Sequence, residues 1–584
     1  MEQLKSLSEE QLKILSNDLR QQIIEVVSKN GGHLSSNLGV VELTVMLHKV
    51  FDTPKDQLIF DVSHQTYAHK ILTGRKEEFS TLRQYQGISG FAKPDESNYD
   101  VFSSGHSSTA VSLAIGSAIK NKEQEEKREV IAIVGDASAT NGLTLEALNY
   151  LGAHKDLKVI IIINDNDMSV SKNVGALAKT FNKIRVKRKK AFIYKITPKF
   201  MHGFLDKMKS GLKSTVYKKS LFDAFNLKYF SGIDGHNIKE LDKYLTYAKK
   251  YPESIVLHIK TVKGKGYSFA ENDKVGLWHH VGPFDIQTGK FLDTNRIQVG
   301  SYLAKYLDYK LEEDKHLKVV TAAMSLGCGL EILTSKHIHS LIDVGIAEEN
   351  AVVISSSLSK NGYVPLVFIY STFLQRAYDQ ILHDVTRTNE HVVFCIDRAG
   401  IVSGDGDTHQ GIFDISYLLP LPNMKILAPS TAENAVECLD YAINCDGPIA
   451  IRYPKYLPNG NSKFVPNKWI IEKELKDINV LSYGSDIEDL KTILGNYNVG
   501  LINAISIKPM DLELLESLKN TKKLIIYEQV NKHSSLGEQV MLYLNKFIEV
   551  VHIALNDTYL VEGQIDELKI YSNIEYEKII KEII

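Results

Sequence analysis

Short runs of apolar, mostly β-branched residues recur along the chain and alternate with helix-like stretches. Uninterrupted apolar strands of this kind are typical of parallel sheets, because helices cover both faces of such sheets. The runs begin at Val130, Val159, Ser254, Lys318, His391, Lys425 and Gly500. The pattern therefore predicts an α/β fold of mainly parallel sheets flanked by helices, in which ligands bind at the carboxyl ends of the strands.

The chain is too long for one hydrophobic core, since it has 584 residues. Two stretches interrupt the alternation: residues 285–314 are polar, and residues 453–469 are rich in Pro, Asn and Gly, which favour turns. We therefore expect three α/β domains, at residues 1–300, 315–455 and 470–584. The strongly basic residues 179–219 are interpreted as a solvated connection within the first domain rather than as a site for polyanions.

Charge and cysteine content exclude several classes of protein. Lysine plus arginine total 69 against 71 for aspartate plus glutamate, so the formal charge of −2 gives no general attraction to nucleic acid or anionic lipid. The four cysteines form no CxxC pair, and neither a signal core nor a membrane-length apolar segment is present. We expect a soluble, cytoplasmic protein without nucleic-acid or membrane partners.

Polar residues follow two successive apolar runs. The first run ends at Gly135-Asp136, and the second ends at Asn164-Asp165-Asn166. If these runs are neighbouring parallel strands, Asp136 and Asn166 lie at the same edge of the sheet, where their oxygens suit Mg²⁺ and diphosphate. Either half alone would be read as an ordinary turn, but the two together at this spacing favour a metal site.

This pair of motifs resembles the cofactor motif of the transketolase-like thiamine diphosphate enzymes. The surrounding text is similar to one family within them, the 1-deoxy-D-xylulose-5-phosphate synthases: "GGHLSSNLGVVELTVMLHKVFD" from Gly31, "DVSHQTYAHKILTGR" from Asp61, "SGHSSTA" from Ser104 and "YSTFLQRAYDQILHDV" from Tyr370. The resemblance spans nearly the whole chain. It implies thiamine diphosphate and Mg²⁺ as cofactors, a transketolase-like fold and a homodimer.

The resemblance also implies roles for individual residues. Mg²⁺ would be bound by Asp136, by the side chain of Asn166 and by the backbone carbonyl of Met168. The cofactor would be surrounded by His64, Gly105, His106, Ser107, Ala137, Ser138, Asn166 and Tyr267.

The chemistry implied is decarboxylation of pyruvate and condensation with D-glyceraldehyde 3-phosphate, which supplies isoprenoid, thiamine and pyridoxal precursors. Glu348 follows an apolar run, so we expect burial to raise its pKa and its carboxyl group to activate the cofactor's aminopyrimidine ring. Glu349 is the alternative for this role. Proton transfer is assigned to His33, His279 and His409, and the acceptor site to Asp405 and Tyr370.

Two arginines are candidates for the substrate phosphate. Arg398 and Arg452 each come at the end of an apolar run, and guanidinium groups bind phosphate oxygens through paired hydrogen bonds.

Three positions depart from the family pattern: Ala137 and Ser63 replace glycines, and Glu349-Asn350 replaces Gln-His. A positive φ at Ala137 would cost about 1–2 kcal/mol, whereas a negative φ would cost little. Two other functions stay open at this point: transketolase-type two-carbon transfer, and a catalytically silent protein that only binds the cofactor.

Overall fold

The computed structural model describes residues 2–166, 175–176, 221–292, 297–460 and 463–584. By its internal contacts the chain divides into two compact units. Unit 1 comprises Met1–Val26, His33–Phe79 and Phe91–His280, and unit 2 comprises Val27–Gly32, Ser80–Gly90 and Val281–Ile584. The basic residues 179–219 and Met168 lie outside the described residues.

Unit 1 contains a five-stranded sheet in which every pair of neighbouring strands is parallel. Its order is β1-β2-β3-β5-β4, with bounds Gln57–Phe60, Val130–Gly135, Ile160–Asp165, Ile255–Lys260 and Lys228–Asp234. The central strands β2, β3 and β5 are almost entirely buried because their side chains are apolar on both faces.

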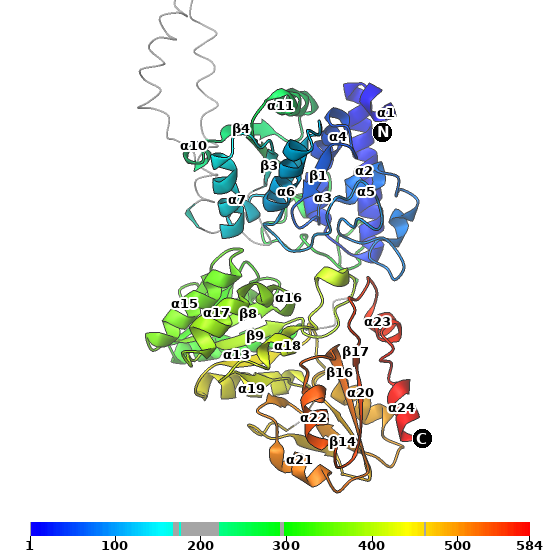
Figure 1. Ribbon diagram of the computed structural model, residues 1–584, viewed down its shortest axis with the longest axis vertical. Helices are drawn as coiled ribbons and strands as arrows, with labels where there is room; N and C mark the ends of the chain where they lie inside the picture. Colours follow the sequence, from blue (N-terminus) through cyan, green and yellow to red (C-terminus); the bar gives the residue numbers. More distant parts are fainter. Residues whose placement is uncertain (1, 167–174, 177–220, 293–296, 461–462) are drawn as a thin grey trace, which may run out of the picture. The chain divides into compact units, whose positions relative to one another are not determined.

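Helices surround this sheet, with α6 (Ala110–Glu123) packed on β1 and β2 and α11 (Ile238–Lys250) on β4 (Figure 1). The other main ones are α2 (Glu9–Asn30), α4 (Val41–Val50), α5 (Tyr67–Leu72) and α7 (Gly142–Ala153). Helix α7 connects β2 to β3, which are directly hydrogen-bonded neighbours. The predicted adjacency of these two strands is confirmed.

Unit 2 contains two further sheets. The seven-stranded sheet has the order β15-β10-β11-β9-β8-β6-β7, with bounds Ser506–Lys508, Lys425–Leu427, Ile449–Arg452, Val393–Asp397, Val364–Tyr370, Leu317–Thr321 and Leu341–Asp343. The five-stranded sheet has the order β12-β14-β13-β16-β17, with bounds Ile470–Lys473, Gly500–Asn503, Ile478–Ser482, Lys523–Asn531 and Glu549–Leu555. Among the described strands, only the pairs β10–β15 and β12–β14 are antiparallel, so the predicted class, α/β with mainly parallel sheets, is confirmed.

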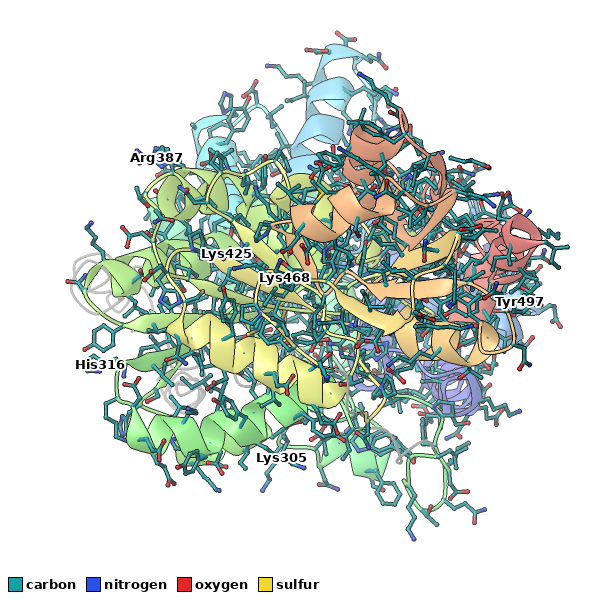
Figure 2. All side chains as sticks on the ribbon, turned by 90° about the horizontal axis from the view of Figure 1, so that it is seen from below. Lys305, His316, Arg387, Lys425, Lys468 and Tyr497 are labelled. Carbon is teal, nitrogen blue, oxygen red and sulfur yellow. The ribbon has the colours of Figure 1, made fainter. Side chains whose placement is uncertain are left out.

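Helices also flank the sheets of unit 2. Helices α13 (Val299–Glu313) and α19 (Ala432–Asn444) pack together, and α15 (Glu348–Lys360) lies on β8 and β6 (Figure 1). The remaining longer helices are α20 (Asp486–Ile493), α21 (Leu512–Leu518), α22 (Leu536–Leu544), α23 (Ile565–Tyr571) and α24 (Glu577–Ile583). Charged side chains such as Lys305 on α13 and Arg387 lie at the outside of the unit in Figure 2.

Helix α13 corrects one expectation from the sequence. Residues 285–314 were expected to lack the strand and helix rhythm, but their second half forms this helix. Leu303, Leu307 and Leu311 recur every four residues and are buried in the core of unit 2. The many charged residues on the other side of the helix hid this apolar stripe in the sequence.

All seven apolar runs form strands. Among the described helices, none combines the length and the apolar composition needed to cross a membrane. The exact domain boundaries stay a prediction.

Candidate functional site

The predicted site residues fall into two sets, one in each unit. In unit 1, β2 and β3 end beside one another, and the Asp136 amide donates to the Asn164 carbonyl oxygen at 3.1 Å. The parallel pairing therefore brings the Gly135-Asp136 turn next to the Asn164-Asp165-Asn166 end of β3, as the spacing predicted.

Two buried carboxyl groups meet at this edge of the sheet. Asp136 is 5% exposed and Asp165 is 2% exposed. Burial raises the pKa of Asp136, and the neighbouring carboxylate of Asp165 raises it further. The ammonium group of Lys263 acts in the opposite direction on Asp136, although burial lowers the pKa of Lys263 to about 8. Two adjacent buried acids and the half-buried amide of Asn166 form a donor set that fits Mg²⁺.

Ala137 adopts a backbone conformation that alanine tolerates without strain. Its φ is −68° and its ψ is −43°, and its amide donates to Asp136 Oδ1 at 3.0 Å. The methyl group therefore does not force a left-handed turn here. The other glycine replacement differs, because Ser63 has a φ of +62° in the left-handed region. Its hydroxyl oxygen accepts from the Ala92 amide at 2.9 Å and donates to the Ser104 carbonyl oxygen at 3.3 Å.

Four histidines of unit 1 gather in one cluster. The ring centroid of His33 lies 5.2 Å from that of His64, 5.5 Å from His279 and 4.7 Å from His280. Nδ1 of His279 lies 3.1 Å from the hydroxyl of Ser36. Burial, followed by the nearby charge of Lys263, lowers the pKa of His279 well below its usual value. This environment therefore favours the neutral form of His279.

Asn37 holds the backbone beneath two of these histidines. Its side-chain amide donates to the carbonyl oxygens of His33 and His64 at 2.6 and 2.7 Å, and its Oδ1 accepts from the Tyr67 amide at 2.9 Å. Asn37 is completely buried. Three hydrogen bonds from one side chain thus fix the two histidine-bearing loops relative to each other.

The turn that carries Gly105, His106 and Ser107 leads into α6. The carboxylate of Asp61 accepts from the amides of Ser108, Thr109 and Ala110 at 2.8, 3.0 and 3.1 Å. Asp61 therefore caps the first turn of α6 and also precedes the loop of His64. Ser138 is buried near the same place, and its carbonyl oxygen accepts from the Ser108 hydroxyl at 3.4 Å.

Tyr267 follows a glycine-rich turn that contains Gly264 and Gly266. Gly264 has a φ of +75°, and a Cβ atom there would lie 2.4 Å from the Ala270 backbone, so only glycine fits. The Tyr267 ring is 7% exposed and packs edge-on against Trp278 at a centroid distance of 5.2 Å.

In unit 2, Glu348 is the first residue of α15 and is 3% exposed. Its Oε2 accepts no hydrogen bond within the described part of the chain, and the nearest cation is Arg376 Nη1 at 3.9 Å. Burial raises the pKa of Glu348 to about 7, as predicted. Glu349 is only partly buried. A buried carboxyl group of this kind fits a ring nitrogen as its partner.

Tyr370 and Arg398 come from adjacent strands of the seven-stranded sheet. Tyr370 ends β8 and lies opposite Asp397, the last residue of β9. The Arg398 guanidinium lies over the Tyr370 ring at 3.8 Å from its centroid, and its Nη1 donates to the Gly327 carbonyl oxygen at 3.0 Å. Stacking and this hydrogen bond orient the guanidinium group.

Arg452 is the last residue of β11, and it is bound to a carboxylate by two hydrogen bonds. Its Nε and Nη2 donate to the carboxylate of Asp414 at 2.8 and 3.2 Å, and the residue is 7% exposed. Any phosphate contact by Arg452 would therefore use the remaining part of its guanidinium group.

Asp405 and His409 lie on the loop after β9. Asp405 forms an ion pair with Arg83, a buried residue of the same unit. The ring of His409 lies 5.6 Å from that of Phe373, and its Nδ1 lies 2.8 Å from the Thr408 hydroxyl. The loop is thus held from two sides.

Sequence reasoning missed several residues that contact the candidate site residues, namely Asn37, Asp61, Arg83 and Lys263. The sequence around a single polar residue does not show which distant residue it will bind through a hydrogen bond or ion pair. Asp61, Asn37 and Lys263 stood inside motifs that were already recognised.

The chain matches known protein families over nearly its whole length. Residues 1–261 match the family described as 1-deoxy-D-xylulose-5-phosphate synthase, residues 283–459 the transketolase pyrimidine binding domain, and residues 467–579 the transketolase C-terminal domain.

Curated relatives match over their full length as well. A 1-deoxy-D-xylulose-5-phosphate synthase of Clostridium tetani is 42% identical over 99% of this chain and 97% of its own. The enzyme of the same name from Clostridium acetobutylicum is 40% identical over 100% of this chain and 98% of its own. That from Macrococcus caseolyticus is 41% identical over 97% and 94%.

Proposed function

Because the chain belongs to the 1-deoxy-D-xylulose-5-phosphate synthase family, we propose that it decarboxylates pyruvate and joins the remaining two-carbon unit to D-glyceraldehyde 3-phosphate. The product is 1-deoxy-D-xylulose 5-phosphate, a precursor of isoprenoids, thiamine and pyridoxal. The observation that carries this proposal is the full-length similarity to synthases of that name. The residue sets described above agree with it.

Thiamine diphosphate and Mg²⁺ are proposed as the cofactors. Asp136 and Asn166, with the carbonyl of Met168, would bind the metal, and the polar turns at Gly105–Ser107 and Ala137–Ser138 would face the diphosphate, together with His64 and Tyr267. When bound, thiamine diphosphate supplies an electron sink for the electron pair released by decarboxylation. The two adjacent buried acids support this assignment, because they need a cation to stay ionised together.

Glu348 is proposed to hold the proton opposite the aminopyrimidine ring. Its pKa of about 7 allows the carboxyl group to be protonated near neutral pH, and its Oε2 has room for a hydrogen-bond partner. His33, His279 and His409 are proposed to move protons to and from the substrate oxygens.

The aldehyde acceptor is proposed to bind in unit 2. Asp405 and Tyr370 would contact its hydroxyl and carbonyl groups, and Arg398 and Arg452 its phosphate. The stacked and hydrogen-bonded Arg398 is the better oriented of the two cations. We further propose that the enzyme is a cytoplasmic homodimer.

The direct test is the reaction of the purified protein with pyruvate and D-glyceraldehyde 3-phosphate. We expect CO₂ release and deoxyxylulose phosphate formation only when both thiamine diphosphate and Mg²⁺ are present. Transfer of a two-carbon unit from xylulose 5-phosphate without CO₂ release would replace the synthase by a transketolase. Cofactor binding without either reaction would identify a silent relative.

A further inference from the structure

A hydrogen-bonded row of side chains runs across the sheet of unit 1 to the proposed metal site. The hydroxyl of Tyr229 lies 2.6 Å from His258 Nδ1, and His258 Nε2 lies 2.8 Å from Asp165 Oδ2. His258 and Asp165 are 1% and 2% exposed in their side chains. Asp165 is one of the two buried acids at the proposed metal site, whereas Tyr229 and His258 have no role in the function proposed above.

Strand register explains why the three side chains meet. Tyr229 on β4 is paired with Val256 on β5, and His258 on β5 is paired with Ile163 on β3. Each step to the next strand is therefore followed by a step of two residues toward the carboxyl edge, which keeps the side chains on one face. The row ends at Asp165, beside the strand that leads to Asp136.

The hydrogen bonds of this row are mutually consistent. A neutral imidazole with its proton on Nε2 accepts from the Tyr229 hydroxyl and donates to the Asp165 carboxylate. One oxygen of Asp165 is thereby fixed, and the carboxyl group is held where it interacts with that of Asp136.

The other polar ends of β3 are held separately. The amide oxygen of Asn164 accepts from the Thr261 hydroxyl at 2.7 Å, and its nitrogen donates to Gln65 Oε1 at 3.2 Å. Asn164 therefore ties β3 to neighbouring segments, and Asp165 is held by His258.

We propose that His258 and Tyr229 are positioning residues of the Mg²⁺ site, which act by fixing the carboxylate of Asp165 beside Asp136. The inference rests on the function proposed above, because it concerns the same metal. Residues that hydrogen-bond to the ligands of a metal site orient those ligands. Mutation of such a residue lowers metal affinity by about 10- to 100-fold.

The test is a titration of the full-length protein with Mn²⁺ in the presence of thiamine diphosphate, followed by electron paramagnetic resonance. We expect His258→Leu to raise the Mn²⁺ dissociation constant about tenfold or more. Tyr229→Phe removes only one hydroxyl and should raise it about fivefold, the ordinary worth of one hydrogen bond. The turnover of both variants should recover at high Mg²⁺ concentration.

His69→Gln is the matched control. His69 is also 1% exposed in unit 1 and bonds a buried carboxylate, that of Asp100, at 2.9 Å. The His69→Gln variant should have a lower thermal stability than the parent and an unchanged Mn²⁺ affinity.

Equal Mn²⁺ affinity in the parent, His258→Leu and Tyr229→Phe proteins would overturn the inference and leave the proposed function standing. If His258→Leu does not fold, Tyr229→Phe decides alone. A parent protein that binds no Mn²⁺ with thiamine diphosphate would overturn both proposals.

Discussion

At the scale of single residues, the environment of a side chain decides its chemistry more than its type does. Glu348 and Glu349 are neighbours in the chain, yet only Glu348 is buried at the start of α15. Removal from water raises the pKa of Glu348 to about 7, so its carboxyl group can bind and release a proton near neutral pH.

Glu348→Gln should retain thiamine diphosphate and lose turnover by about 10²- to 10⁴-fold, because the amide cannot exchange the proton. Cofactor binding is followed by circular dichroism and turnover by CO₂ release. Glu349→Gln is the matched control and should keep ordinary turnover. Full activity of Glu348→Gln would remove Glu348 from this role.

The same substitution has a pH signature in the cofactor-free protein. The folded pKa of about 7 exceeds the ordinary glutamate value of 4.5. The folded state therefore binds more protons between these values, and its stability falls as the pH rises. Glu348→Gln lacks this loss and should gain up to about 3 kcal/mol relative to the parent on going from pH 4 to pH 8. The free energies of unfolding are measured by urea denaturation at each pH. A difference between the two proteins that stays constant from pH 4 to pH 8 would contradict the raised pKa of Glu348.

The two arginines should respond differently to alanine. Arg398→Ala should raise the KM for D-glyceraldehyde 3-phosphate by the equivalent of about 2–3 kcal/mol. It should lower stability less than Arg452→Ala does, because it breaks a single 3.3 Å contact with the buried Asp397 carboxylate. Arg452→Ala also leaves the Asp414 carboxylate buried without its partner, so it should destabilise the protein by about 3–5 kcal/mol. Steady-state kinetics with varied aldehyde, together with thermal melting, separates the effects, and Arg452→Ala/Asp414→Asn should restore part of the stability. An unchanged KM in Arg398→Ala would exclude it from the phosphate site.

At the scale of elements, strand ends and helix starts organise the site. Asp136, Asn166, Tyr370, Arg398 and Arg452 all lie at or just after the carboxyl ends of parallel strands. This placement follows from the parallel fold, because the turns at one edge of a parallel sheet bring successive strand ends together. The turn with His106 immediately precedes helix α6, and the Asp61 carboxylate accepts hydrogen bonds from the amides at the start of this helix.

Asp61→Ala should cost about 2 kcal/mol of stability, since it leaves three amides at the start of α6 without their acceptor. Asp61→Asn keeps one acceptor oxygen and should cost less. Because the turn carries His106, both variants should also weaken thiamine diphosphate binding in the same order. Urea denaturation and cofactor titration measure the two effects, and an Asp61→Ala protein as stable as the parent would contradict the capping role.

At the scale of the whole molecule, the cofactors should stabilise the folded chain by mass action. Thiamine diphosphate and Mg²⁺ together at 100 times their dissociation constants should add about 2.7 kcal/mol, whereas either alone should add much less. Differential scanning calorimetry measures this as a rise in Tm. Asp136→Ala should abolish the rise, and a rise that survives in this variant would move the metal site elsewhere.

Much of the fold was predictable because it depends on local patterns. Every apolar run became a strand, and the pairing of β2 with β3 followed from the single crossover between them. Helix α13 was missed because its apolar stripe is interrupted by charged residues, so that the average composition of the segment is polar.

The sequence by itself determined the α/β class, the neighbouring ends of β2 and β3, and the identity of most candidate residues, since these depend on periodicity and on motifs that are contiguous in the chain. Only the tertiary structure decided that Ala137 is unstrained, that Asn37 ties two histidine loops together, and that Arg452 is committed to Asp414. It also joined Tyr229, His258 and Asp165 in one row. Such contacts are set by register and packing between distant segments, and a linear pattern does not record them.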